Sequence, residues 1–194
     1  MLRASDITLG ILAGGRASRL GGIDKAWLER DGQAQVLRWW QRFGGEVGQV
    51  LVSANRTPQR YREAGLVSVP DRVGDGIGPL AGLDALADAC ATPWLLTIPV
   101  DLVGVNECLL QTLAAMRDAD GAFAVDDDGA QPLVALWRVQ ALRPALSAAL
   151  AADERAVRGL QARLELAAVR LEGVRFGNLN TPDDLAAAGI PPAT

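Results

Sequence analysis

The 194-residue sequence contains no histidine and only two cysteines, Cys90 and Cys108. Without histidine, serine–histidine and cysteine–histidine catalysis, histidine general bases and most transition-metal sites are excluded. Two cysteines in apolar or helical contexts indicate neither a disulfide framework nor a zinc site, and we expect both to be ordinary buried thiols. The chemistry that remains, that of carboxylates, lysine and arginine, suits phosphoryl or nucleotidyl transfer with a hard metal ion.

Long hydrophobic runs and basic runs are also missing from the chain. No stretch approaches the roughly 18 uninterrupted apolar residues of a membrane span, and the N-terminus leads into a first strand without a secretory signal. The net charge is −4 and the basic residues are dispersed, so we expect neither nucleic acid nor a membrane as a partner. These features predict a cytoplasmic protein.

The composition itself is typical of a folded protein, with 49% hydrophobic residues. Strand-like and helical segments alternate, which predicts an α/β fold: a single domain over residues 1–194 with a Rossmann-like, doubly wound, mostly parallel sheet. The expected strands are 7–12, 50–53, 66–69, 94–98 and 166–171. The expected helices are 36–43, 58–64, 79–89, 107–116 and those within 139–164.

One small antiparallel hairpin is expected in this sheet. Residues 122–125 and 133–137 are typical of strands, and they flank Asp126-Asp127-Asp128-Gly129. The acidic triplet is compatible with a metal site, but a solvated hairpin turn explains it better. A short extended piece at 27–32, closed by an Asp-Gly turn, is also expected.

The first strand is followed by a glycine-rich loop with the sequence LAGGRASRLGGIDK, residues 12–25. Its glycines allow backbone N–H groups to approach an anion, and Arg19 and Lys25 add positive charge. Glycines alone are equally typical of an ordinary turn, but two cations at fixed offsets favour a phosphate site. The spacing of P-loop NTPases does not occur, and Leu12 and Arg16 break the dinucleotide fingerprint. The loop therefore indicates a phosphate site of another type.

Further polar residues follow the expected strands, and ligands bind across the carboxyl ends of strands in such a sheet. The segment 53–56, which contains Asn55, and Asp71, Asp101 and the segment 178–180 are placed in this way, so we expect them to converge on the first loop. A carboxylate at Asp101 is able to hold Mg²⁺ against an α-phosphate, although a turn or helix-capping role explains it equally well from this segment alone.

Two other segments favour helix starts near this edge. The glycines from Gly74 to Gly82 present a helix N-terminus at Pro79, which is a natural anion site. A plain loop with close helix packing at Gly82 is the alternative. In the second segment, Thr181 is a good N-cap and the proline and two aspartates after it suit a first helical turn.

The loop pattern Leu-Ala-Gly-Gly-x-x-x-Arg-x-Gly-Gly-x-Asp-Lys resembles the molybdenum cofactor guanylyltransferase (MobA) family of Rossmann-like nucleotidyltransferases. Gly-Pro-Leu-Ala-Gly at 78–82 and Asn-x-Asn-Thr-Pro at 178–182 resemble two further motifs of that family. The resemblance implies transfer of GMP from Mg-GTP to molybdopterin bearing molybdenum, with release of pyrophosphate. It also implies molybdenum-insertion proteins and apo-molybdoenzymes as partners.

The same resemblance implies roles for individual residues. The implied catalytic residues are Arg19, Lys25 and Asp101, with Asp101 as the ligand of Mg²⁺. The implied nucleotide-binding residues are Leu12, Ala13, Gly14, Gly15, Lys25, Asn55, Asp71 and Asp101. The implied pterin-binding residues are Gly22, Gly78, Gly82, Arg155, Asn178 and Asn180.

Three positions depart from the family's pattern: Ser53 replaces an asparagine, Val100 a cysteine and Ala156 an arginine. They leave two alternatives open. One is a related transferase that uses another nucleotide or acceptor, such as a cytidylyltransferase, although those usually carry Leu-Ala-Ala-Gly where this chain has Gly14 and Gly15. The other is a non-catalytic adaptor that binds GTP or the pterin, against which the retained Lys25 and Asp101 count.

Overall fold

A computed structural model describes residues 2–14, 23–73, 77–105 and 107–190. Seven strands form a central sheet in the order β10-β8-β9-β6-β1-β4-β5. They are β1 (Ile7–Leu12), β4 (Gln49–Ser53), β5 (Val67–Val69), β6 (Trp94–Pro99), β8 (Gly121–Asp126), β9 (Gly129–Arg138) and β10 (Leu166–Arg170). Within this sheet only the two pairings made by β9 are antiparallel. The predicted mostly parallel sheet with one hairpin is confirmed.

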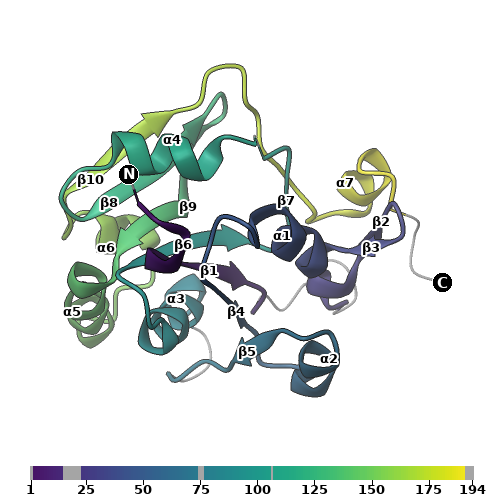
Figure 1. Cartoon of the computed structure of the whole chain (residues 1–194), viewed down its shortest axis with the longest axis horizontal. Helices are drawn as coiled ribbons and strands as arrows, with labels where there is room; N and C mark the ends of the chain where they lie inside the picture. Colours follow the sequence, from purple (N-terminus) through teal and green to yellow (C-terminus); the bar gives the residue numbers. More distant parts are fainter. Residues whose placement is uncertain (1, 15–22, 74–76, 106, 191–194) are drawn as a thin grey trace.

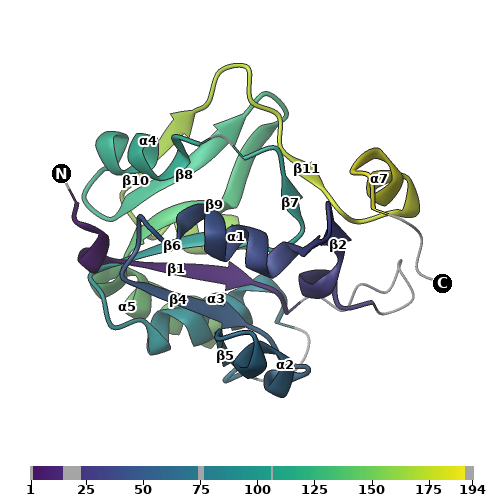
Figure 2. The same ribbon diagram turned by 45° about the vertical axis from the view of Figure 1, so that its right-hand side comes forward.

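Helices cover both faces of the sheet, as Figure 1 and Figure 2 show. One face carries α1 (Gln35–Phe43), α2 (Pro58–Glu63) and α4 (Leu109–Met116), which share a hydrophobic cluster with the sheet. The other face carries α3 (Pro79–Ala89), α5 (Val139–Ala151) and α6 (Val157–Gln161), which share a second cluster. The Rossmann-like α/β fold is therefore confirmed.

The central strand β1 shows how the sequence supports the two faces. Its side chains alternate, so Leu9 and Ile11 pack into the first cluster while Gly10 faces α3. A Cβ added at Gly10 would lie 2.9 Å from Leu86 Cδ1. The glycine thus lets α3 approach the sheet closely, which a larger residue would prevent.

The single turn η1 (Ala4–Asp6) lies at the amino edge of the sheet, directly before β1. The other short elements lie at the carboxyl edge. The first of these are η3 (Lys25–Trp27), β2 (Glu29–Arg30) and β3 (Gln33–Ala34). The rest are β7 (Leu102–Val103), β11 (Gly177–Asn178) and α7 (Pro182–Ala187). The expected Asp-Gly turn is present between β2 and β3, with φ values of 55° at Asp31 and 74° at Gly32. Trp27, predicted as extended, belongs instead to η3, because Asp24 caps this single turn by accepting from the N–H of Ala26.

The C-terminal segment returns to the edge of the sheet, where β11 pairs with β7. Beyond that pair, α7 lies beside β2 in both views (Figure 1 and Figure 2). Leu179, Leu185 and Ile190 pack there against Leu28 in a small separate cluster. This cluster fixes the C-terminal segment close to the residues that follow the glycine-rich loop.

Two sequence expectations are corrected by burial. Cys90 is buried, but Cys108 is exposed at the N-cap of α4, so the expectation of two buried thiols is wrong for Cys108. The acidic triplet does form the hairpin turn, but Asp126 is fully buried rather than solvated. Within the described residues, none of the helices combines the length and apolar content that crossing a membrane requires.

The buried carboxylate of Asp126 joins the backbone at Phe176 to the hairpin turn. Its Oδ2 accepts from the N–H of Phe176 at 2.8 Å, and its Oδ1 accepts from the N–H of Asp128 at 3.0 Å. Burial opposes ionisation, but the hydrogen bonds from Phe176, the Gln131 side chain and the turn outweigh it. The pKa of Asp126 therefore lies below its ordinary value.

We expect Asp126→Asn to lower the free energy of unfolding by about 1–3 kcal/mol, because an amide NH₂ would face one of the backbone donors. Asp127→Asn, at the exposed neighbouring position, is the matched control and should change stability little. Urea denaturation of the three proteins at pH 7 measures both effects. Equal stability of the two variants would contradict the anchoring role.

The pH dependence of this difference has a definite sign. Because folding lowers the pKa of Asp126, its stabilisation is fully present above the ordinary aspartate pKa of about 3.9. That stabilisation is lost as the pH falls through the lower folded pKa. The gap in unfolding free energy between wild type and Asp126→Asn should therefore shrink below about pH 4.

Candidate nucleotide-binding site

A cavity of about 890 Å³ lies at the carboxyl edge of the sheet, within the size range of small-molecule sites. The sequence-predicted residues that line it are Leu12, Ala13, Gly14, Lys25, Asn55, Asp71, Gly78, Gly82 and Asp101. Residues that follow β1, β4, β5 and β6 thus converge on one space. The expected convergence at strand ends is confirmed for these residues.

Lys25 lies at the centre of a three-residue contact at the edge of this cavity. Its Nζ lies 2.8 Å from Asp101 Oδ2 and 2.5 Å from Asn180 Oδ1. The side chains of Lys25 and Asp101 are 13% and 20% exposed, so the ion pair is largely shielded from water. A partly buried ammonium interacts more strongly with a nearby anion than one in bulk water does. This contact brings together the first loop, the end of β6 and the C-terminal segment.

Backbone contacts hold Asn180 next to Asp101. The N–H of Leu179 donates to the carbonyl of Asp101 at 2.9 Å, directly beyond the β7–β11 pair. Thr181 caps α7, and Asp184 accepts in return from the N–H groups of Asn180 and Thr181. The Thr181 hydroxyl and these two N–H groups hold the pKa of Asp184 below its ordinary value. The predicted helix start is confirmed, and it also orients Asn180.

Asn55 and Asp71 form a reciprocal pair on the opposite wall. Asn55 Nδ2 donates to Asp71 Oδ2 at 2.7 Å, and the N–H of Asp71 donates to Asn55 Oδ1 at 2.8 Å. This second bond determines which way the Asn55 amide points. Buried Ser53 donates to the other carboxylate oxygen at 3.5 Å. The pair therefore orients a carboxylate at the wall of the cavity.

Gly82 allows the backbone of α3 to come close to Ser53. A Cβ at Gly82 would lie 2.6 Å from Ser53 Oγ and 3.1 Å from Leu12 Cδ2, whereas one at Gly14 would lie 3.8 Å from Ser53 Oγ, an ordinary van der Waals contact. The sequence allowed two roles for Gly82, close helix packing or a place in a binding site. The structure shows close packing of α3 against β4, and Gly82 also lines the cavity. Ser53 fills a position where a longer side chain would meet α3.

Several predicted site residues are not part of this geometry. Arg19, Gly15 and Gly22 lie outside the described residues. Asn178 belongs to β11 and is not among the residues that line the cavity. Arg155 is 64% exposed, pairs with Asp153 at 3.2 Å, and is likewise absent from the cavity wall.

The structure adds residues that sequence reasoning did not select: Tyr61, Ile77 and Leu133 also line the cavity. Asp24 and Arg56, which belong to two of the predicted segments but were given no role of their own, line it as well. Asp24 could have been found from the sequence, because an aspartate immediately before Lys25 is typical of a helix N-cap. Its other carboxylate oxygen accepts a hydrogen bond from Thr57 Oγ1 at 3.4 Å. No local signal marks Leu133, which the antiparallel β9 brings to this edge. Burial raises the pKa of Tyr61, so its phenol stays neutral at physiological pH.

The oxygen donors of this site fit a hard divalent cation. Mg²⁺ is commonly held by one or two carboxylates together with substrate phosphates. Asp101 offers a partly exposed carboxylate to the cavity. Asn180 Oδ1 is a second oxygen nearby, since Lys25 Nζ donates to both side chains. These residues suit a metal shared with a polyphosphate.

Comparisons with known proteins agree with this geometry. The family model described as the MobA-like NTP transferase domain matches residues 9–169. A molybdenum cofactor guanylyltransferase from Cupriavidus necator is 37% identical over 194 residues, which cover 95% of this chain and 97% of that protein.

Solved structures share the fold at lower identity. Molybdopterin-guanine dinucleotide biosynthesis protein A from Archaeoglobus fulgidus has a TM-score of 0.67 at 20% identity, covering 93% of this chain and 96% of that one. The 2-C-methyl-D-erythritol 4-phosphate cytidylyltransferase from Thermus thermophilus has a TM-score of 0.66 at 18% identity, covering 92% and 95%. At these identities the likeness shows the fold alone.

The packing of Gly82 against Ser53 can be tested by a double-mutant cycle. We expect Gly82→Ala to lower the free energy of unfolding by about 1–3 kcal/mol, because the new methyl group overlaps Ser53 Oγ. Ser53→Ala removes that oxygen, so the double variant should recover part of the loss, with a coupling of about 0.5–3 kcal/mol in denaturant unfolding.

Gly45→Ala is the matched control, since a Cβ there meets nothing within 4 Å. It should leave stability nearly unchanged. Strictly additive effects of the Gly82 and Ser53 substitutions would show that the two residues do not pack in the way described.

Proposed function

The chain belongs to the family of MobA-like NTP transferases, and from that membership we propose that it transfers GMP from GTP to molybdopterin bearing molybdenum. The products are molybdopterin guanine dinucleotide and pyrophosphate. The observation that carries the proposal is the contact of Lys25 with Asp101 and Asn180, on the same cavity as the Asn55–Asp71 pair. One half of the cavity suits a base and the other a polyphosphate.

The nucleotide half is supported by the wall of the cavity around Asp71. Its carboxylate is held by Asn55 and Ser53, so it can accept N–H groups from a base without first having to be ordered. The backbone of Leu12, Ala13 and Gly14 forms the adjacent wall, at the end of β1. A guanine offers both a ring N–H and an amino group, which pair well with a carboxylate.

The triphosphate is assigned to Lys25 and Asp101. The ammonium of Lys25 has three N–H donors, and its two contacts in the structure leave a donor for phosphate oxygens. Asp101 would hold Mg²⁺, which supplies neutralisation of the negative charge that develops on the transferring group. Arg19 and Gly15 complete this half in our proposal.

The reaction then needs positioning more than proton transfer. An anionic oxygen of the pterin's terminal phosphate attacks the α-phosphorus of GTP, a new P–O bond forms, and the bond to the β-phosphate breaks to release pyrophosphate. Because the attacking oxygen already carries negative charge, no protein base is required, which agrees with the absence of histidine. Lys25 balances charge on the phosphates while they remain aligned.

The pterin half rests on Asn180, which already contacts Lys25. We also assign Asn178, Gly78 and Gly82 to pterin binding, together with Gly22 and Arg155. Arg155 would have to turn from its exposed pair with Asp153 to reach the substrate. We also propose that the chain acts as one domain in the cytoplasm, where GTP is available, between molybdenum-insertion proteins and apo-molybdoenzymes.

We expect purified protein to release pyrophosphate from Mg-GTP and molybdenum-bearing molybdopterin, and Asp101→Asn to abolish this activity. Lys25→Met should lower the turnover by at least about 100-fold, because it removes charge stabilisation of the transition state. A coupled pyrophosphate assay measures both. Asp118→Asn is the matched control, because Asp118 is an exposed aspartate in the segment that precedes β8. Binding of GTP without turnover in the wild type would favour an adaptor instead.

Base preference separates guanylyl transfer from cytidylyl transfer. With Mg²⁺ present, GTP should raise the melting temperature of the protein more than CTP or ATP does at equal concentration. The preference should be reduced in Asn55→Ala, because Asp71 then loses the amide that orients it. Stabilisation by CTP but not by GTP would refute the guanylyltransferase proposal.

A further inference from the structure

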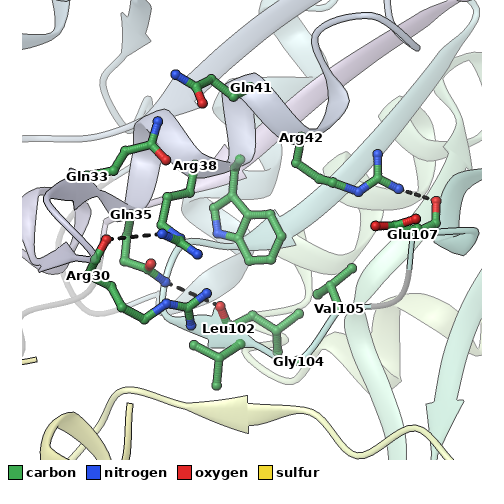
Figure 3. Close-up of a pocket in the computed structure, with 12 residues that line it drawn as sticks. Arg30, Gln33, Gln35, Arg38, Gln41, Arg42, Leu102, Gly104, Val105 and Glu107 are labelled. Atoms are coloured by element: carbon green, nitrogen blue, oxygen red, sulfur yellow. Dashed lines mark hydrogen bonds between the residues drawn. The ribbon is translucent and has the colours of Figure 1, made fainter. Parts of the chain in front are cut away.

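A second cavity, of about 500 Å³, lies along the same segment that carries Asp101. Pro99 to Asp101 line the nucleotide cavity, whereas Leu102 to Val105 line the second one. The two cavities have no lining residue in common. The other walls of the second cavity come from β2, β3 and α1, and Figure 3 shows the side chains that face it.

The second cavity carries an excess of positive charge. Three arginines line it, Arg30, Arg38 and Arg42, but Arg42 is paired with Glu46 at 2.5 Å, so the charges that face a ligand are those of Arg30 and Arg38. Figure 3 shows the guanidinium groups of Arg30 and Arg38 directed into the same space beside Gln35, whereas Arg42 points toward Glu107. Two guanidinium groups that share a space are arranged to receive an oxyanion.

The carboxylate nearest to these two arginines does not neutralise them fully. Asp31 Oδ2 lies 3.3 Å from Arg38 Nη1 and 3.8 Å from Arg30 Nε, and its side chain is 79% exposed. Exposed ion pairs of this kind contribute little. Burial lowers the pKa of Arg30 and the neighbouring charge of Arg38 lowers it further, while Asp31 opposes these two effects only in part.

Gln35 adds a hydrogen-bond acceptor that has no partner among the described residues. The residue is 2% exposed and lines the cavity. Its Nε2 donates to the carbonyls of Val100 and Leu102 at 3.5 and 3.4 Å, and this determines the orientation of the amide. Its buried Oε1 is left without a hydrogen bond. A buried acceptor in this state is unfavourable unless a ligand supplies a donor.

The two features together restrict the ligand. The guanidinium groups of Arg30 and Arg38 would bind an oxyanion, and Gln35 Oε1 would accept a hydrogen bond from an O–H or N–H group close to that anion. Inorganic phosphate at neutral pH carries both, since it keeps a P–OH group. A phosphate ester with a neighbouring hydroxyl carries both as well, but sulfate and simple carboxylates offer no donor.

We propose that the second cavity binds a small phosphate-bearing molecule, whose phosphate lies between Arg30 and Arg38 and whose O–H group donates to Gln35 Oε1. The site is distinct from the nucleotide cavity. Its occupant lies against the backbone of Leu102, next to Asp101. Binding can be tested without GTP or a pterin, so the result is independent of the proposed guanylyltransferase activity.

The test is a titration of the full-length protein with inorganic phosphate, glycerol 3-phosphate and sulfate at constant ionic strength, followed by melting temperature and calorimetry. We expect phosphate or glycerol 3-phosphate to bind more tightly than sulfate. Tighter binding of phosphate would indicate free phosphate as the ligand, and tighter binding of glycerol 3-phosphate would indicate a phosphate ester. Arg38→Met should weaken binding at least about tenfold, because it removes a charge-assisted hydrogen bond. Arg30→Met provides a second variant if Arg38→Met does not fold.

Gln35→Leu separates donor recognition from charge. The variant should lose the preference for phosphate over sulfate while it still binds both anions, because the acceptor is removed and both arginines remain. Arg163→Met, at an exposed arginine outside both cavities, is the matched control and should leave this binding unchanged. The proposal is overturned if binding disappears in Lys25→Met but survives Arg30→Met and Arg38→Met, or if phosphate acts no differently from sodium chloride.

Discussion

Asp101 belongs to a short stretch of backbone that is held from several sides at once. The N–H of Val100 donates to the carbonyl of Leu12 at 3.0 Å, and the carbonyl of Val100 accepts from Trp39 Nε1 at 3.2 Å. The carbonyl of Asp101 accepts from the N–H of Leu179. The central strand, helix α1 and the C-terminal segment therefore all meet at this stretch. A carboxylate attached to it has little freedom, and its position relative to Lys25 follows from the fold.

The alternation of strands and helices and the edge on which polar residues gather were predictable because both follow from local patterns. An apolar run of six residues such as β1 indicates a buried strand, and the carboxyl ends of parallel strands necessarily share one edge. That reasoning was sufficient to bring Asn55, Asp71 and Asp101 together. The capping signal at Thr181 likewise predicted α7 from sequence alone.

What could not be predicted depends on partners distant in the sequence. Asp126 was expected to be solvated because its neighbours are charged, yet the N–H of Phe176, 50 residues away, makes burial favourable. The pairing of Asn180 with Lys25 has the same origin, since no local pattern indicates which lysine an asparagine near the C-terminus will contact. Gln35 is a further case, because a helical glutamine is ordinarily exposed and only Val100 and Leu102 explain why it is not.

The contact between Lys25 and Asn180 joins residues separated by 155 positions, nearly the whole chain. During synthesis Lys25 is made well before Asn180, and a chain folds from its N-terminus onward. A nascent chain can therefore contain β1, β4 and β6 and still lack the residue that holds the Lys25 ammonium. The complete three-residue contact forms only after residue 180 has been made.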